Sequence, residues 1–146
     1  MKGYLNNEEA TRTTLKDGWL HSGDIGYYDQ SHRFYIVDRL KELIKVKGFQ
    51  VAPAELEDLL RLNGKVQDVA VIGVPHERFG EVPRAYVVRA SEEVTEAELH
   101  EFVNTEVAEF KQLRGGLEFV KQIPKSPSGK ILRRELKAAF EEAANE

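Results

Sequence analysis

The chain has 146 residues, which suits one ordinary domain with a modest core, and 41% of them are hydrophobic. Its formal net charge of −4 argues against a general nucleic-acid binder. Cysteine is absent, which excludes disulfides, thiolate nucleophiles and Cys-based zinc sites. No apolar run approaches the roughly 20 residues of a membrane span, and the first residues lack the pattern of a signal peptide. We therefore expect a soluble intracellular protein without a nucleic-acid partner or a membrane span.

The N-terminal part reads as surface structure followed by two hairpins. Met1–Lys16 is polar and irregular, which predicts a surface segment or a short helix. Ile25–Tyr28 and Phe34–Val37 are β-rich runs on either side of a polar stretch, and this pattern predicts a hairpin. Leu43–Val51 reads as a second hairpin that turns at Lys47-Gly48, where glycine supplies a positive φ.

The rest of the chain mixes helices and strands. The apolar spacing after Pro53, after the capping box at Thr95 and after Leu132 predicts helices, the first ending at Asn63-Gly64 and the second reaching Phe110. The expected strands are Val69–Val74, Ala85–Val88 and Leu117–Ile123, with Pro75–Pro83 between the first two. The predicted fold class is α+β, a small sheet with helices packed on it and a hairpin before it.

A loop near the C-terminus is the first candidate for chemistry. Lys125-Ser126-Pro127-Ser128-Gly129-Lys130 combines small residues that let a ligand approach with a lysine suited to phosphate or carboxylate oxygens. It is not a P-loop, because Pro124 and Ile131 replace the first glycine and the Ser/Thr of that motif. The competing interpretation is a solvated turn before a helix.

Two further candidates precede it. Asp24 could accept hydrogen bonds from a sugar diol, or it could be an ordinary turn aspartate. Lys45 and Lys47 would point to one face of a strand and meet an anion, or they could only guard a solvated edge. The run Arg133-Arg134 with Lys137 is interpreted as a solvated helix face.

No metal site is predicted, since the four histidines show no ligand spacing. The charged stretch Asp38-Arg39-Leu40-Lys41-Glu42 allows a hinge by composition but does not demand one.

Taken together and in order, three motifs resemble the adenylate-forming superfamily. Trp19-Leu20-His21-Ser22-Gly23-Asp24 resembles its ribose-binding motif, and Val37–Glu57 resembles its hinge and thioester-forming motif. Pro124–Lys130 resembles the motif that ends in the catalytic lysine. The long hinge motif is similar to that of 4-coumarate–CoA ligases and beetle luciferases, and Leu113-Arg114-Gly115-Gly116 is similar to luciferases and luciferase-like acyl-CoA synthetases.

The resemblance implies a role for each matching residue. Asp24 would hold the ribose hydroxyls of the adenylate with help from Arg39. Lys41 would be the hinge residue and would also belong to the nucleotide-binding set. Lys45 and Gln50 would face the adenylate during thioester formation, with Lys47 and Gly48 near CoA. Lys130 would contact the carboxylate and the α-phosphate during adenylation.

The resemblance also implies a domain organisation. Residues 1–38 would finish a large AMP-binding domain, residues 39–42 would be the hinge, and residues 43–146 would be the mobile C-terminal domain. The phosphate loop, the adenine pocket and the acyl pocket would lie outside this chain, so the fragment alone is expected to be inactive.

The implied activity is that of an ATP-dependent carboxylic acid–CoA ligase, similar either to 4-coumarate–CoA ligases or to medium- and long-chain acyl-CoA synthetases. It would use ATP, CoA, a small-molecule carboxylic acid and Mg²⁺ bound mainly by the missing N-terminal domain, which would be the partner of this chain. The expected location is cytoplasmic or peroxisomal, although the last three residues are not a Ser-Lys-Leu signal. The alternatives are a luciferase-type adenylating oxygenase and a non-catalytic interaction module.

Overall fold

The computed structural model describes residues 1–144, so two of the three residues compared with the Ser-Lys-Leu signal lie outside the described residues. The chain divides into two compact units, Met1–Lys41 and Glu42–Glu146. This division falls inside the segment 39–42, whose role as a hinge stays a prediction.

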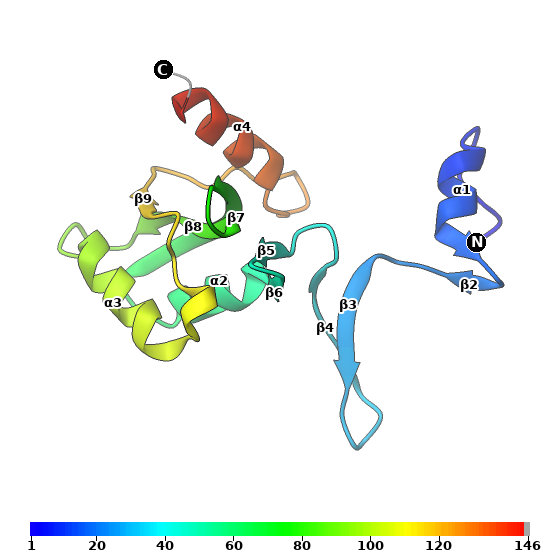
Figure 1. The fold of residues 1–146 in the computed structure, drawn as a ribbon, viewed down its shortest axis with the longest axis horizontal. Coiled ribbons are helices and arrows are strands. Elements are labelled where there is room, and N and C mark those ends of the chain that lie inside the picture. The colour runs from blue at the N-terminus through cyan, green and yellow to red at the C-terminus, as the bar shows by residue number, and fades with distance from the viewer. Residues whose placement is uncertain (145–146) are drawn as a thin grey trace. The chain divides into compact units, whose positions relative to one another are not determined.

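The first unit is built from short elements (Figure 1). Helix α1 spans Glu8–Thr14, strand β1 (Leu15–Lys16) pairs with β2 (Trp19–Leu20), and β3 (Asp24–Tyr28) pairs antiparallel with β4 (Phe34–Arg39). The hairpin that the β-rich runs predicted is thus confirmed. No side chain of this unit is fully buried, so the unit has no core of its own.

The second unit is one mixed sheet with helices. Its strands have the order β6-β5-β8-β7, with β9 parallel to β8, and span Ile44–Val46 (β5), Phe49–Val51 (β6), Val66–His76 (β7), Gly80–Arg89 (β8) and Leu117–Phe119 (β9). Its helices are α2 (Pro53–Arg61), α3 (Glu96–Glu106), α4 (Arg133–Ala144) and a 3₁₀ turn at Glu109–Lys111. The predicted α+β class is confirmed.

Helices cover both faces of this sheet, α2 and α3 on one face and α4 on the other (Figure 1). Val69 and Val71 of β7 pack with Leu56 of α2, whereas alternate β7 residues such as Ile72 pack with Leu136 of α4. Successive side chains of a strand point to opposite faces, and both faces are covered here, so β7 is buried without interruption from Val69 to Val74.

The central hairpin is longer than the sequence predicted. Strands were expected over Val69–Val74 and Ala85–Val88, with Pro75–Pro83 connecting them. Instead, β7 runs to His76 and β8 begins at Gly80, so both prolines lie inside strands.

The prolines are tolerated because their nitrogens point away from the β7–β8 pairing. The carbonyl of Pro83 accepts from the N–H of Gly115, and the two backbone polar positions of a strand residue face the same edge. Gly73 pairs with Pro83, and Pro75 pairs with Glu81 two residues further along β7. Because backbone polar groups alternate between the two edges of a strand, the nitrogen of Pro75 faces the outer edge of β7. Neither proline removes a ladder hydrogen bond.

Two other boundaries differ from the prediction. Helix α3 ends at Glu106 because Val107 is extended (φ −121°, ψ 154°), and Phe110 lies in the 3₁₀ turn. Strand β9 ends at Phe119 rather than Ile123. The expected N-cap is confirmed, since the side chain of Thr95 accepts from the N–H of Glu98.

A buried ion pair closes the outer edge of β7. The residue Glu57 on α2 is 3% exposed, and its carboxylate accepts from the Val71 N–H at 2.9 Å. Arg133, the first residue of α4, donates from Nε to the Val71 carbonyl at 3.2 Å and from a terminal nitrogen to Glu57 Oε1 at 2.7 Å. Burial raises the pKa of Glu57, against the opposing effects of the Val71 N–H and the Arg133 charge.

Lys47 and Gly48 form the two-residue turn between β5 and β6. Both have positive φ, 48° and 85°, as a type I′ hairpin turn requires. The second predicted hairpin and its turning point are confirmed.

We expect Glu57→Gln to change the pH dependence of stability. A raised folded-state pKa means that the native state binds more protons than the unfolded state. The wild-type chain therefore loses free energy of unfolding at this site as pH rises from about 4, near the unfolded pKa of glutamate. The glutamine side chain does not titrate, so the variant lacks this loss. In urea titrations, its free energy of unfolding should rise relative to that of the wild type as pH increases from acidic to neutral. A difference that is flat with pH would contradict the assigned environment of Glu57.

We expect Gly48→Ala to lower the free energy of unfolding by about 1 kcal/mol, because alanine is strained at positive φ. No atom lies within 4 Å of the added Cβ, so the loss would come from the backbone alone. Gly64→Ala is the control, since its Cβ would also meet open space and its φ lies outside the left-handed region. Equal stability of the two variants in urea denaturation would refute the strained turn.

Candidate functional site

Asp24 and Arg39, both predicted to contact the nucleotide, lie directly opposite each other on β3 and β4. Arg39 Nε is 2.8 Å from Asp24 Oδ1, and 61% of the arginine side chain is exposed. The backbone beside them is fixed, because the Leu40 N–H donates to the Gly23 carbonyl. The pair therefore offers a carboxylate and a guanidinium together on an accessible edge of the first unit.

Lys45 and Gln50, predicted to face the adenylate, are cross-strand partners on β5 and β6. Directly opposed residues have Cβ atoms about 5 Å apart and share a face. Ile44 and Val46 turn into the core, which leaves Lys45 exposed. The Lys45 N–H also donates to the Glu81 carboxylate at 2.9 Å, which ties this short hairpin to β8.

Lys47 lies in the turn rather than on a strand, so the expectation that Lys45 and Lys47 share a strand face is wrong. The left-handed conformation at the turn redirects its side chain, and Lys47 Nζ lies 4.7 Å from the ring centroid of Phe79. The Lys47 N–H donates to the Phe79 carbonyl, which fixes the turn against the start of β8.

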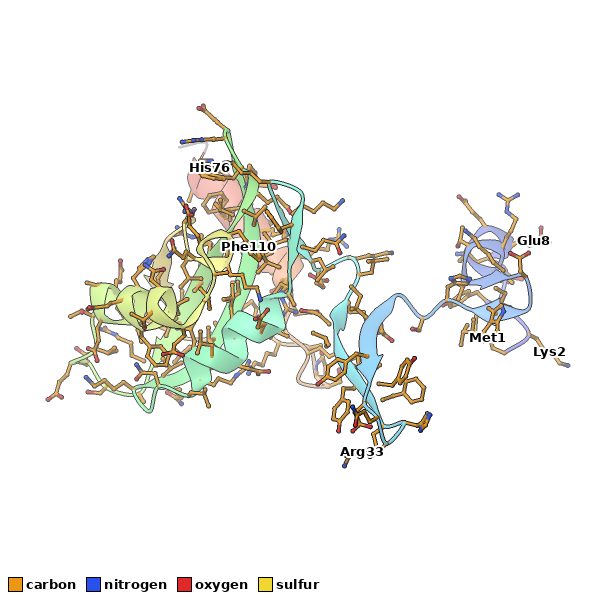
Figure 2. The ribbon with its side chains drawn as sticks, turned by 60° about the horizontal axis from the view of Figure 1, so that its bottom comes forward. Met1, Lys2, Glu8, Arg33, His76 and Phe110 are labelled. Atoms are coloured by element: carbon orange, nitrogen blue, oxygen red, sulfur yellow. The ribbon has the colours of Figure 1, made fainter. Side chains whose placement is uncertain are left out.

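A pocket of about 190 Å³ lies beside this turn. Phe49 and Phe110 stack in its wall with ring centroids 4.4 Å apart, and Lys47 and Arg114 both lie over Phe79. Figure 2 labels Phe110 among the side chains of this unit. Glu109 also lines the pocket, and its carboxylate accepts from Arg114 at 2.7 Å. Aromatic faces with the Lys47 ammonium above them suit a flat ring that carries negative charge nearby.

Lys130 sits at the end of a small ordered hairpin and is exposed. Its N–H donates to Ser126 Oγ at 3.2 Å, and its carbonyl accepts from the Ser126 N–H at 2.8 Å. Gly129 has φ +81°, and Lys125 Nζ is 2.6 Å from the Asp68 carboxylate on β7. The backbone at Lys130 is thus held by hydrogen bonds, while the Lys130 side chain is exposed to solvent.

The predicted solvated face of the last helix is wrong for Arg133. Its side chain is only 16% exposed and bonds to Glu57 and Val71. Sequence reasoning missed this arginine, Glu57 and Asp68 as structural partners. The available signal was a glutamate within the apolar stripe of α2, between Leu56 and Leu60.

Lys41 is exposed and ends the first unit. Its roles as hinge and nucleotide ligand stay predictions.

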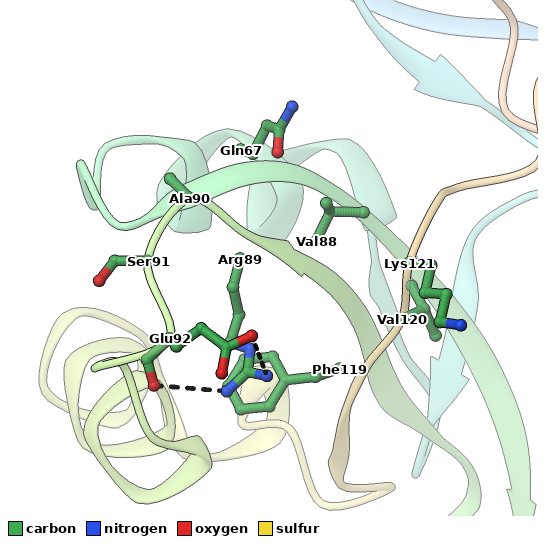
Figure 3. A pocket seen from close by; sticks show the side chains of 9 residues that line it. All are labelled: Gln67, Val88, Arg89, Ala90, Ser91, Glu92, Phe119, Val120 and Lys121. Carbon is green, nitrogen blue, oxygen red and sulfur yellow. Dashed lines mark hydrogen bonds and ion pairs between the residues drawn. The ribbon is translucent and has the colours of Figure 1, made fainter.

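A separate hollow of about 540 Å³ lies at the ends of β7, β8 and β9 (Figure 3). Arg89 crosses it, stacks 4.5 Å from the Phe119 ring centroid and reaches the Glu92 carboxylate at 3.9 Å. None of the predicted site residues lines it.

Within residues 1–144, no group of three or more histidine, aspartate and glutamate side chains could hold a metal ion. The same part of the chain contains no helix long and apolar enough to cross a membrane.

Known proteins resemble this chain over nearly its whole length. The 4-coumarate–CoA ligase 1 of Glycine max is 55% identical over 141 residues, 94% of this chain and 48% of that protein. The 4-coumarate–CoA ligase of Vanilla planifolia is 53% identical over 146 residues, 99% of this chain and 26% of that protein. The chain thus spans from a quarter to about half of these relatives.

Solved structures also match this chain over nearly its whole length. A fatty acyl CoA synthetase from Mycobacterium tuberculosis superposes with a TM-score of 0.72 at 40% identity, covering 95% of this chain and 28% of that one. ATP-bound MatB from Rhodopseudomonas palustris gives a TM-score of 0.89 at 33% identity, with 95% and 28% covered.

The family model described as the AMP-binding enzyme C-terminal domain matches residues 55–130, more than half of the chain. The chain therefore belongs to this family, and the resemblance to adenylate-forming enzymes seen in its motifs is confirmed.

Proposed function

We propose that this chain is the C-terminal part of an ATP-dependent carboxylic acid–CoA ligase of the 4-coumarate–CoA ligase type. In the first half-reaction, a carboxylate oxygen attacks the α-phosphorus of ATP, which forms an acyl-adenylate and releases pyrophosphate. In the second, the thiol of CoA attacks the acyl carbon, loses its proton and releases AMP. The relatives support this class, since they are named 4-coumarate–CoA ligases.

One observation carries the mechanism: two exposed lysines lie at different places on one compact unit. Lys45 lies on β5 and bonds through its N–H to Glu81, whereas the Lys130 hairpin and the helix after it are anchored at Asp68 and Val71. Asp68 pairs with Val88 of β8, and Val71 pairs with Ala85. At about 3.3 Å per strand residue, they lie roughly 13–23 Å from Glu81 along that strand.

A rigid unit with separate lysine surfaces suits two reaction steps. Rotation about Lys41 would present one surface to a common active site at a time, as hinge closure allows. Lys130 would stabilise charge on the carboxylate and α-phosphate oxygens during adenylation, and Lys45 with Gln50 would face the adenylate during thioester formation.

The other ligands follow from the same proposal. Asp24 would accept from the ribose hydroxyls, with Arg39 beside it. Lys47, Gly48 and the aromatic pocket suit CoA, because cations over phenylalanine rings fit an anion with an attached base. Mg²⁺ would enter with the ATP phosphates, which would supply most of its protein-independent ligands.

The first unit would complete the large AMP-binding domain. Trp19 is 75% exposed and Phe34 is 79% exposed, and the unit has no buried side chain. Large apolar side chains in this state indicate a surface that another part of the protein covers. The missing domain would supply the phosphate loop and the acyl pocket, so the fragment alone would be inactive. The proposed location of the enzyme is the cytoplasm or the peroxisome, and the lack of cysteine in this chain is compatible with a reducing compartment.

The two lysines separate the half-reactions in the full-length enzyme. Lys130→Ala should slow adenylation, measured by ATP–pyrophosphate exchange, by about 10²–10³-fold, because one preorganised charge is lost. The same variant should convert supplied acyl-adenylate and CoA to thioester at nearly the wild-type rate. Lys45→Ala should show the reverse pattern.

Equal slowing of both steps by both variants would show that the lysines share one site, against the proposal. Light emission with luciferin and ATP would instead indicate the luciferase-type oxygenase. Normal activity of both variants, with loss of a protein partner, would favour the interaction module.

A further inference from the structure

The hairpin that carries Lys130 is held to the domain at both ends. On one side, Lys125 Nζ lies 2.6 Å from the Asp68 carboxylate of β7. On the other, the hairpin leads into α4, which begins at Arg133 and is bonded to β7, and the N–H of Leu132 donates to the Pro124 carbonyl at 2.9 Å, which joins the two ends of the hairpin. The position of Lys130 therefore depends on where these two ends are fixed.

Arg133 fixes the second end from inside the protein. Three residues after Lys130, its guanidinium reaches the outer edge of β7, where it donates to the Val71 carbonyl and to the Glu57 carboxylate. The Glu57 side chain is 4% exposed and the Arg133 side chain 16%, whereas the Lys125 and Asp68 side chains are 39% and 25% exposed. The buried anchor makes two hydrogen bonds, and the loss of either partner would leave a buried polar group unmatched, so Arg133 constrains the backbone more than the partly exposed Lys125–Asp68 pair does.

The same contacts join elements from opposite faces of the sheet. Glu57 belongs to α2 on one face, and Arg133 begins α4 on the other. The two side chains meet over Val71, whose outward N–H and carbonyl they satisfy. This arrangement locks the start of α4 in register with the sheet, and with it the chain just before α4.

We propose that Arg133 and Glu57 are positioning residues that set the location of Lys130 for adenylation. The inference rests on the proposed role of Lys130 and deepens it. A lysine side chain is long and flexible, so its ammonium group can be preorganised only if its backbone is fixed. A displacement of about 1 Å in a reacting group can cost 10²-fold in rate.

The test uses the full-length enzyme and the variant Arg133→Met, which keeps an unbranched apolar stem and removes both hydrogen bonds. Adenylation, measured by ATP–pyrophosphate exchange, should slow by about 10–10²-fold, chiefly in kcat, because Lys130 is misplaced rather than lost. Thioester formation from supplied acyl-adenylate and CoA should stay near the wild-type rate. A merely structural role would slow both half-reactions together.

Arg134→Met is the matched control, since it removes the same charge one residue further along from an exposed position. It should leave both half-reactions unchanged. If Arg133→Met fails to fold, Glu57→Gln serves as the second variant, because its amide oxygen can still accept from Val71 while the charge that holds Arg133 is gone. It should show the same selective loss in smaller degree.

A double-mutant cycle decides whether Arg133 acts through Lys130. In the Lys130→Ala background, Arg133→Met should cause no further loss of adenylation, because the group it positions is already absent. If the double variant slows adenylation by the product of the two single-variant factors, the inference is overturned. Equal adenylation rates for Arg133→Met and Arg134→Met would also overturn it. If Lys130→Ala itself leaves adenylation intact, the proposed function has failed, and the outcome is distinct from a failure of the positioning role.

Discussion

The ion pair between Glu57 and Arg133 at the outer edge of β7 is the interaction on which the rest of the second unit depends. An edge strand presents unpaired backbone groups, and here the Val71 N–H and carbonyl are satisfied by Glu57 and Arg133 rather than by another strand. Because these side chains come from helices on opposite faces, one ion pair fixes α2, β7 and α4 together. Removing either partner would leave a buried polar group unmatched, which typically costs about 3–5 kcal/mol.

The domain therefore combines a buried core with exposed lysine side chains. The central residues of β7 and β8 are buried, whereas the two lysines proposed to act in catalysis are exposed, Lys45 on β5 and Lys130 in the hairpin before α4, and are fixed only through their backbones. Lys45 is held by a cross-strand partner and by Glu81, and Lys130 by its own hairpin bonds and the Arg133 anchor. A domain of this kind can deliver either charge to an active site by moving as a whole, without internal rearrangement.

Much of the fold follows from local patterns. The tight turn at Lys47-Gly48, the helix after Pro53 and the N-cap at Thr95 were predictable because each depends on neighbouring residues. The extent of β7 and β8 was not, since local rules treat Pro75 and Pro83 as interruptions. Only the tertiary arrangement shows that their nitrogens face away from the ladder. Glu57 and Arg133 stand 76 residues apart, and no local rule pairs them. The pairs of Asp24 with Arg39 and of Lys45 with Gln50 follow from hairpin register, which the turn positions imply but do not fix.

Amide hydrogen exchange in the full-length enzyme tests most directly whether the buried pair holds the Lys130 hairpin. The informative amides are those of Ser126 and Lys130, which bond within the hairpin, and that of Ala85, which bonds in the sheet. The account predicts that Arg133→Met accelerates exchange at Ser126 and Lys130 relative to Arg134→Met, while Ala85 stays protected. Unchanged exchange in the hairpin, or an equal increase at all three amides, would contradict it.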